Sequence, residues 1–496
     1  MTRWLPLSVV LAACATTPPP APEPEVISRP MPGLESPSTK PVPSRLPPAL
    51  AVDPTKLPAA PLALTLRKPE TLALANGVTV YLVEDHTTPL VLLRAILPFG
   101  SVDEPADKLG LASLTAELLT EGGAGALSAE ALDELLEFHA ADASSGATDE
   151  YATVSLSVRA ADLAKLFPVF ADVLQRPRFD AKRFEVARAS ALESIRRRED
   201  RPDAVASRAL NKAVFGPDSP LAREPLQKHL EAISLADVKR FFAAACSPRG
   251  TRLVITGDFD AAMVKALLSL HVAGWKGAAP PARTWPTPPA LTRRVILVPR
   301  NVPQVKIRVG TWGFARQSPD EYALRLVNTA LGSFGVGRLY KEIRDERGLA
   351  YSAYSVVSPG PTTGLFLAGF DTRPEQAVEA LKLGLHVLDG VGAGEPLSQG
   401  ELDTAAEMSL NAFVFRFDTA ARIGFERALY DAFGYAPDYL ERYRERTQAV
   451  TLAQANAAAR RYSKDLQIVV VGPASLEAAL TTLGPVTVIS DVERFR

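Results

Sequence analysis

The spacing of apolar residues along this chain alternates between two periods. Short runs of branched apolar residues predict β-strands, and apolar residues three or four positions apart predict amphipathic helices. Strands are predicted at 78–83, 91–97, 153–158, 253–257, 295–298, 305–309, 365–370 and 468–472. Helices are predicted at 109–123, 181–198 and 377–388. Strands interleaved with helices in this order indicate the α+β class, with helices covering one face of a sheet.

The predicted elements occur twice. A helix that starts with Ser-Leu-Ala at 234–236 leads to the strand at 253–257, and one that starts with Thr-Leu-Ala at 451–453 leads to the strand at 468–472. Upstream, Ala-Val-Phe-Gly at 213–216 matches Asp-Ala-Phe-Gly at 431–434. The starts lie 217 residues apart, from Ser234 to Thr451. This period is that of a duplicated domain, because it is too long for a solenoid unit.

Proline-rich stretches divide the chain. The stretch at 276–292 separates the two copies, so we assign domains to 63–275 and 293–496. The segment at 14–62 is rich in proline and poor in aromatic residues and cannot bury a core. We interpret it as an extended tether, with a proline-rich ligand for a partner domain as the alternative.

The first residues have the pattern of a secretion signal. A positive start at Thr2-Arg3 precedes an apolar run of about ten residues, which is too short to span a bilayer. The run ends in Leu11-Ala12-Ala13-Cys14, which resembles the lipobox of bacterial lipoproteins. The resemblance implies that residues 1–13 are removed and that Cys14 is lipidated. An ordinary secretory signal with a chance cysteine is the alternative.

The charge balance excludes some functions. Lys and Arg number 55, Asp and Glu number 56, and the net charge is −1. Such a chain has no global field that attracts nucleic acid, so we expect no nucleic-acid partner. Its two cysteines, Cys14 and Cys246, cannot supply a disulfide framework or a thiolate zinc site. Its five histidines include no i, i+4 pair, which leaves no histidine metal site in the sequence.

The helix predicted at 109–123, LGLASLTAELLTEGG, decides the metal chemistry. Its Gly-Leu-Ala frame resembles the insulinase/pitrilysin-like metallopeptidases, inverted zincins in which the motif H-x-x-E-H follows directly. The resemblance places the first zinc-binding His at Ser113, the general base at Ala116 and the second His at Glu117, which share one helix face. All three are changed. A hydroxyl is a poor zinc ligand and a methyl group accepts no proton, so metal binding and base catalysis should be lost.

The same resemblance implies a third zinc ligand on a later helix. Glu193 lies 76 residues after Glu117 and matches that position, whereas the acidic residue often found two turns earlier is Val186 here. One ligand of three does not make a tight zinc site. Glu117 and Glu193 could instead bind a hard cation weakly through their oxygen atoms. The alternative is that Glu193 pairs with an arginine or faces water.

The second copy contains the segment of the chain that matches a family motif most specifically. The segment IRDERGLAYS at 343–352 resembles the part of the family that holds substrate backbone with an Arg and a Tyr seven residues later. Here these residues are Arg344 and Tyr351. Arg offers a fixed fork of donors for carbonyls or a carboxylate, and the Tyr hydroxyl can bond a carbonyl. The alternative is a helix that ends at Gly348 with Arg344 on a solvated face.

Three close glycines precede that segment. Gly332, Gly335 and Gly337 resemble a shortened glycine-rich loop of the non-catalytic subunit of mitochondrial processing peptidase, which contacts the presequence. A phosphate loop is not indicated, because no Gly-Lys-Ser/Thr follows. A tight strand-to-helix turn is the alternative to a binding role.

The resemblance covers about residues 66–489 and implies two mitochondrial-processing-peptidase-like α/β sandwich domains, each a mostly antiparallel sheet covered by helices. It also implies a non-catalytic subunit that closes a chamber and binds peptide for a partner with an intact H-x-x-E-H motif. We expect a heterodimer or heterotetramer in which zinc belongs to the partner and this chain holds no cofactor. The lipid anchor implies the bacterial envelope, at the outer membrane facing the periplasm.

Two other classes of function stay open. A scaffold or binding lipoprotein would reuse the peptidase fold without a peptidase role, and it predicts no neighbouring gene with an H-x-x-E-H motif. A metallopeptidase active by itself would need an unrecognised site. The lack of a histidine pair argues against this last alternative.

Overall fold

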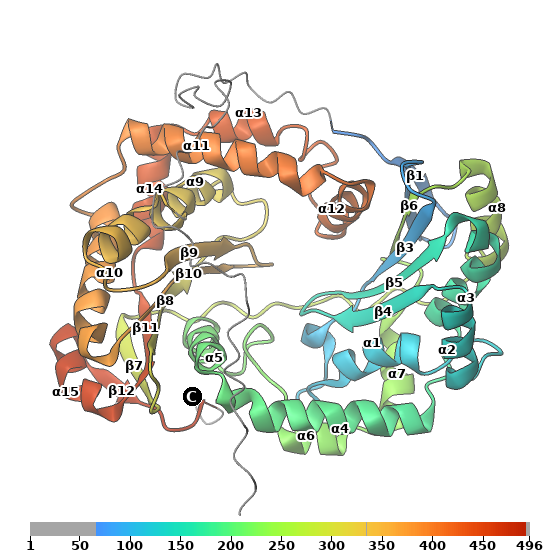
Figure 1. The fold of residues 1–496 in the computed structure, drawn as a ribbon, viewed down its shortest axis with the longest axis horizontal. Helices are drawn as coiled ribbons and strands as arrows, with labels where there is room; N and C mark the ends of the chain where they lie inside the picture. Colours follow the sequence, from blue (N-terminus) through green and yellow to red (C-terminus); the bar gives the residue numbers. More distant parts are fainter. Residues whose placement is uncertain (1–65, 334, 493–496) are drawn as a thin grey trace, which may run out of the picture. The chain divides into compact units, whose positions relative to one another are not determined.

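The computed structural model describes residues 66–333 and 335–492. The signal at 1–13, Cys14 and the tether lie outside these residues, so what the sequence indicates about them stays a prediction. In the described ranges, no helix has both the length and the apolar composition that crossing a membrane requires. The chain from Ala63 to Arg496 forms one compact unit, organised by two six-stranded sheets (Figure 1).

The first sheet has the strand order β1-β2-β6-β3-β5-β4. All its neighbouring pairs are antiparallel except β2 and β6. Its strands are β1 (Glu70–Ala73), β2 (Thr79–Glu84), β3 (Leu90–Leu97), β4 (Asp142–Ala147), β5 (Ala152–Arg159) and β6 (Arg252–Gly257). The helices of this half are α1 (Leu111–Glu121), α2 (Ala129–Phe138), α3 (Leu163–Gln175), α4 (Ala181–Arg197), α5 (Pro202–Phe215), α6 (Gln227–Ala232), α7 (Leu235–Ala245) and α8 (Ala261–His271).

The second sheet has the order β12-β7-β11-β8-β10-β9. Its strands are β7 (Arg294–Pro299), β8 (Val305–Trp312), β9 (Ala353–Ser358), β10 (Leu365–Thr372), β11 (Gln467–Gly472) and β12 (Val486–Val488). Its helices are α9 (Glu321–Gly332), α10 (Ala377–Gly392), α11 (Gln399–Val414), α12 (Ala420–Ala432), α13 (Tyr443–Gln448), α14 (Leu452–Tyr462) and α15 (Glu477–Leu480), with a π-helical turn at Tyr340–Glu346. The segment at 276–292 between the halves contains no helix or strand.

The two sheets show the duplication directly. Five consecutive strands match in order and connection, from β2-β6-β3-β5-β4 to β7-β11-β8-β10-β9. The sixth strand differs between the sheets. In the first sheet it is β1, which comes before the five in sequence and pairs antiparallel with β2, whereas in the second it is β12, which comes after them and pairs parallel with β7. The structure therefore confirms the predicted α+β class with two related, mostly antiparallel sheets.

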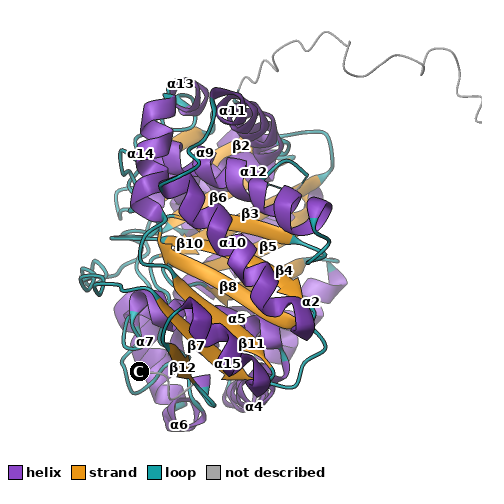
Figure 2. Ribbon diagram, turned by 90° about the vertical axis from the view of Figure 1, so that its left-hand side faces the viewer, coloured by secondary structure: helices purple, strands orange, loops and turns teal. Residues whose placement is uncertain are grey.

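Each sheet is covered on both faces, which the sequence did not predict. One face carries the helices of its own half, such as α1 and α3 on the first sheet. On the second sheet this face carries α10 (Figure 2). The opposite face carries one helix from the other half. Val205, Ala209 and Val214 of α5 pack on the valine-rich strands β7 and β11 of the second sheet. Ala428 of α12 packs on Tyr81, Ile96 and Val254 of the first sheet.

A buried ion pair also joins the halves. Glu150, in the turn between β4 and β5, accepts two hydrogen bonds from Arg316, which follows β8. Both side chains are only 13% exposed. The Arg316 guanidinium lies 3.7 Å from the ring centroid of Phe433, just beyond α12. The pair is shielded from solvent, so removing one partner leaves an uncompensated charge.

Replacing Arg316 by Ala should therefore lower the free energy of unfolding by about 3 kcal/mol, since Glu150 would stay buried without its partner. Urea denaturation followed by circular dichroism measures this. The control is Arg293→Ala, which removes an exposed pair with Asp389 and should cost less than about 1 kcal/mol. Equal losses in the two variants would contradict the role assigned to the buried pair.

Candidate functional site

The start of α1 is fixed by a buried carboxylate. Glu104 accepts hydrogen bonds from the backbone N–H groups of Gly110 (3.0 Å) and Ala112 (2.7 Å). Burial raises the pKa of Glu104 to about 7. Gly110 has φ +100°, a left-handed conformation that glycine adopts without strain, and its chain turns there into the helix. The Gly-Leu-Ala frame seen in the sequence is thus the structural entry to α1.

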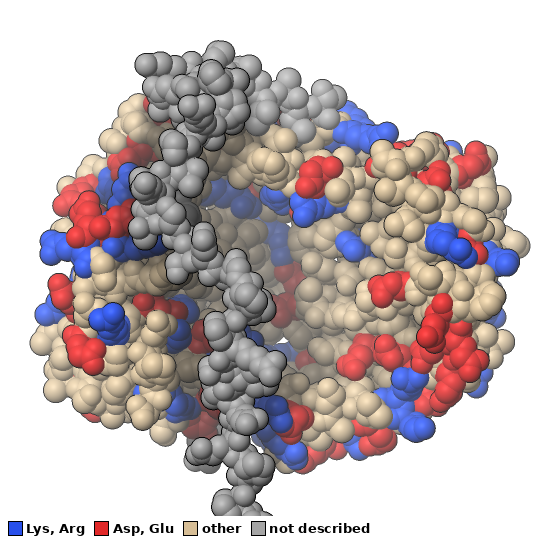
Figure 3. All heavy atoms as spheres, in the orientation of Figure 1, with Lys and Arg blue, Asp and Glu red and all other residues tan. Residues whose placement is uncertain are grey.

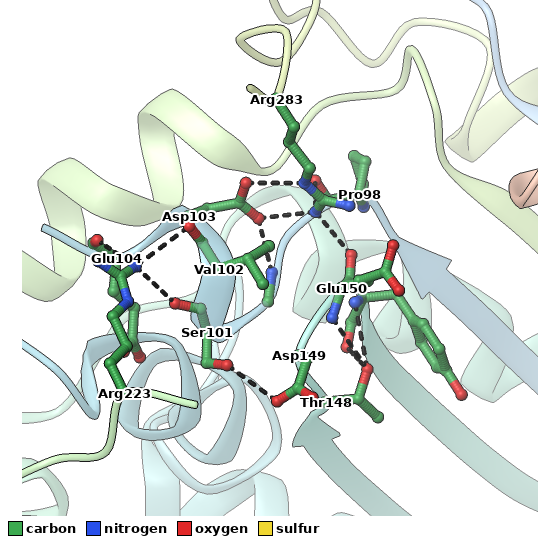
Figure 4. Close-up of polar contacts among 12 residues, drawn as sticks. Pro98, Ser101, Val102, Asp103, Glu104, Thr148, Asp149, Glu150, Arg223 and Arg283 are labelled. Carbon is green, nitrogen blue, oxygen red and sulfur yellow. Dashed lines mark hydrogen bonds and ion pairs between the residues drawn. The ribbon is translucent and has the colours of Figure 1, made fainter. Parts of the chain in front are cut away.

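Two arginines hold the loop at 98–104 that leads to α1 (Figure 4). Arg223 donates to three carbonyl oxygens of this loop, at 2.8–3.1 Å. Arg283, from the segment between the halves, forms a bidentate pair with Asp103 at 2.8 and 2.7 Å. It also donates to the backbone oxygen of Glu150 at 2.6 Å. These bonds therefore hold the segment at 276–292 against the loop at 98–104, which leads into α1.

The face of α1 expected to carry the zinc motif is split between solvent and core. Ser113 and Glu117 are exposed, as a ligand pair would be. Ala116 is fully buried in the core of the first half, so the three positions on this helix face differ in their exposure to solvent. Partial desolvation and the nearby Glu121 carboxylate raise the pKa of Glu117 above its ordinary range.

Glu193 is held by arginines of its own helix. Its carboxylate accepts a hydrogen bond from Arg197 Nε at 2.6 Å and lies 3.6 Å from Arg196. This matches the expected pairing with an arginine. Within the described ranges, no three His, Cys, Asp or Glu side chains gather into a possible metal site. A hydroxyl, a methyl group and two carboxylates, one of them paired, do not fit zinc, which prefers imidazole or thiolate ligands here.

The Arg/Tyr motif of the second half does come together. Arg344 lies in the π-helical turn, a rare conformation that often marks functional sites. Its guanidinium carbon is 4.7 Å from the ring centroid of Tyr340 and 5.1 Å from that of Tyr351. The Tyr340 hydroxyl accepts a hydrogen bond from Arg344. Tyr351 is 83% exposed, so this stack is open to solvent.

Tyr340 was not among the predicted site residues. Its position four residues before Arg344 would have been a signal in an α-helix, since such pairs lie on one face. The turn after the stack agrees with the alternative drawn from the sequence: Gly348 has φ +61° and donates its N–H to the Arg344 carbonyl at 2.9 Å. Arg344 is half-buried rather than fully solvated.

The three glycines have different surroundings. A Cβ on Gly332 would lie 2.0 Å from Ser355 N, and one on Gly337 would lie 2.6 Å from the Leu331 carbonyl oxygen, so packing alone requires both glycines. Gly335 is exposed with φ +79° and has open space around it. Arg338 anchors the end of this loop through a bidentate pair with Glu401. A substrate contact at this loop stays a prediction.

Comparison with known proteins gives the family. Residues 79–224 match the family model described as Insulinase (Peptidase family M16), and residues 232–408 match the one described as Peptidase M16 inactive domain. The chain belongs to the insulinase (M16) family. A solved peptidase M16 inactive domain from Pseudomonas fluorescens is 27% identical, with a TM-score of 0.74, and the match covers 82% of this chain and 98% of that one.

The M16 relatives carry contrasting names. An uncharacterized zinc protease of Streptomyces coelicolor is 30% identical over 266 residues, which is 52% of this chain and only 57% of the relative. Another from Mycobacterium tuberculosis is 26% identical over 436 residues, covering 85% of this chain and 96% of the relative. A non-peptidase homolog of Helicobacter pylori is 24% identical over 350 residues, covering 69% and 79%. M16 relatives thus include proteins named as peptidases and as non-peptidases.

Restoring two histidines to α1 would test whether only the ligands were lost. Ser113→His combined with Glu117→His places two imidazoles one turn apart at exposed positions. This variant should bind Zn²⁺ at least about 10-fold more tightly than the unmodified protein, measured by competition with a chromophoric chelator. It should still cleave no peptide, because Ala116 supplies no base.

The single variant Ser113→His is the matched control for this graft. If the double variant bound Zn²⁺ no better than the single one, α1 would have lost the ligand geometry as well as the ligands.

Proposed function

We propose that this chain is the non-catalytic subunit of an insulinase-like zinc peptidase of the bacterial envelope. Its partner carries the H-x-x-E-H motif and the zinc, in a heterodimer or heterotetramer. This chain closes the shared chamber and binds the peptide. Lipidation at Cys14 would hold it at the outer membrane, facing the periplasm.

One contrast carries the proposal. On α1, no group at Ser113, Ala116 or Glu117 can act as a histidine ligand or as the general base. In the second half, Arg344 and the exposed Tyr351 lie together, with the guanidinium 5.1 Å from the ring centroid. Loss of catalytic groups beside retained binding groups is what a subunit that binds substrate for another chain requires. The match to the M16 inactive domain and the relative named a non-peptidase homolog support the same assignment.

The Arg344 stack suits peptide backbone. Between the rings of Tyr340 and Tyr351 the guanidinium loses less freedom on binding than a free side chain, since cation–π contacts already orient it. Its fork can donate two parallel hydrogen bonds to a backbone carbonyl or a terminal carboxylate. The Tyr351 hydroxyl adds a further donor at the solvent side.

The competing function is a scaffold lipoprotein with no peptidase role. It shares the emptied α1 but requires nothing of Arg344 or Tyr351. The two functions therefore differ in what removal of this pair does to peptide turnover by a partner.

The decisive experiment combines the full-length protein with an M16 subunit that carries H-x-x-E-H. Arg344→Ala with Tyr351→Ala should lower kcat/KM for peptide cleavage by about 10- to 100-fold, because a charge-assisted hydrogen bond and an aromatic contact are lost. Turnover of a mixed peptide library, followed by mass spectrometry, measures the change.

Arg347→Ala is the matched control, since Arg347 is an exposed arginine of the same segment. It should leave turnover within about twofold of the unmodified pair. Unaltered turnover in the double variant would contradict peptide binding by Arg344 and Tyr351 and favour the scaffold function. Cleavage by the isolated chain would overturn both functions.

A further inference from the structure

The second half contains a cavity at the position that corresponds to the zinc face of the first half. The strand β9 ends the second sheet as β4 ends the first, and α9 packs on β9 as α1 packs on β4. Ser145 of β4 donates to a carbonyl oxygen of α1, and Ser355 of β9 donates in the same way to the Asn328 carbonyl oxygen of α9. The duplication therefore extends to this corner of each half.

The exposed positions of the two helices also correspond. In α1, Ser113 and Glu117 are exposed within an otherwise buried run, and in α9 the partly exposed Arg325 and Thr329 have the same spacing, although Asn328 is partly exposed where Ala116 of α1 is buried. Polar groups thus occupy the positions where the family places its zinc ligands in the first half. On the facing helix α11, Ser409 shares a hydrogen bond of 3.2 Å with Thr329.

The cavity between α9, α11 and β9, here named the C-half cavity, has a volume of about 410 Å³. This is within the range of small-ligand sites, roughly 300–1,000 Å³. Its wall is part polar and part apolar. The polar groups include Arg325, Asn328 and Arg416, and the apolar groups include Met408 and Phe413.

Two guanidinium groups line the C-half cavity with donors to spare. Arg325 gives Nε and Nη2 to Glu321, at 3.2 and 3.0 Å, and its Nη1 donates to no acceptor among the described residues. Arg416 gives Nη2 to Glu426 at 2.6 Å and to the Tyr430 hydroxyl at 3.2 Å. Burial opposes the charge of Arg416, but Tyr430 and Glu426 outweigh it and raise the pKa of Arg416. The positive charge of Arg325 is a smaller opposing effect. An anion between them would relieve this repulsion and use the remaining N–H groups.

A second observation indicates that the ligand also has a hydrogen-bond donor. Asn328 Oδ1 is buried and has no donor within the described part of the chain. Such an acceptor costs stability unless it is satisfied. Asn328 lines the C-half cavity, so an N–H of a bound ligand would be the donor that this oxygen lacks.

We propose that the C-half cavity binds a terminal carboxylate whose residue carries an apolar side chain. The carboxylate accepts hydrogen bonds from Arg325 and Arg416, and the adjacent N–H donates to Asn328. The side chain packs on Met408 and Phe413. A peptide C-terminus and a free amino acid both supply this chemistry, and the peptide form rests on the proposed function.

Isothermal titration of the full-length protein tests the site with four probes: N-acetyl-leucine, N-acetyl-leucinamide, free leucine and inorganic phosphate. N-acetyl-leucine should bind with a Kd below about 1 mM, and the amide at least about 10-fold more weakly, because it lacks the charge. Tighter binding of N-acetyl-leucine than of leucine identifies a peptide end, and the reverse identifies a free amino acid. Equal binding of the amide, or phosphate binding as tightly as N-acetyl-leucine, would overturn the proposal.

Two variants alter the cavity in different ways. Arg416→Gln removes one charge, and Ala412→Phe fills the cavity from an exposed position on α11 without removing any charge. Each variant should bind N-acetyl-leucine at least about 10-fold more weakly than the unmodified protein. Arg442→Gln, at an arginine of similar exposure that pairs with Glu445, is the control and should leave binding unaltered. Unaltered binding in both cavity variants would place the ligand elsewhere and end the proposal.

This measurement is independent of the partner subunit. The Arg344→Ala, Tyr351→Ala variant should bind N-acetyl-leucine like the unmodified protein, since neither residue lines the C-half cavity. If the protein binds N-acetyl-leucine but does not stimulate a partner subunit, only the proposed function is contradicted. If the protein stimulates the partner but does not bind N-acetyl-leucine, only the proposal of a ligand in the C-half cavity is contradicted.

Discussion

Burial of the second face of each sheet is the constraint on which the rest of this structure depends. A sheet whose strands read Ile-Val-Val-Val, as β11 does, is apolar on both faces and needs two covers. Each half supplies only one, and takes the other from its neighbour through α5 or α12. The contact is close: a Cβ on Gly424 of α12 would lie 2.6 Å from Val254, and one on Gly310 of β8 would lie 2.9 Å from Leu210 of α5. The halves therefore stabilise each other.

The helix α1 is held in place by contacts at its start and by burial of its core side. Its entry is still fixed by Glu104 and Gly110, and the loop before it is still held by Arg223 and Arg283. Ala116 now fills the core, where a glutamate would bring a charge into an apolar setting at high cost. Positive and negative side chains are interspersed over the face of the molecule that Figure 3 shows.

The sequence predicted the central strands and missed the edges, for a physical reason. β2, β3, β8 and β11 are runs of branched apolar residues whose burial is encoded in their own composition. The edge strand β4 reads Asp-Ala-Ser-Ser-Gly-Ala and has no such pattern, so only its pairing with β5 makes it a strand.

The same distinction holds for the candidate site. The exposure of Ser113 and Glu117 follows from helical period, and the proximity of Arg344 and Tyr351 follows from a turn at Gly348. The burial of Ala116 and the stacking of Tyr340 could not be predicted in this way. They depend on which elements pack around α1 and on the π-helical form of the 340–346 turn.

The reciprocal placement of α5 and α12 has a consequence for how such a fold can arise. Each half is incomplete in the same way, so two copies of one half would complete each other as a symmetric, domain-swapped dimer. The segment at 276–292 converts that association into an intramolecular one, for which a short linker supplies an effective concentration in about the millimolar range. Joined in this way, the two copies stay together at any dilution, and each is free to diverge from the other. Side chains such as Ser113 in one copy and Arg344 in the other can therefore change independently.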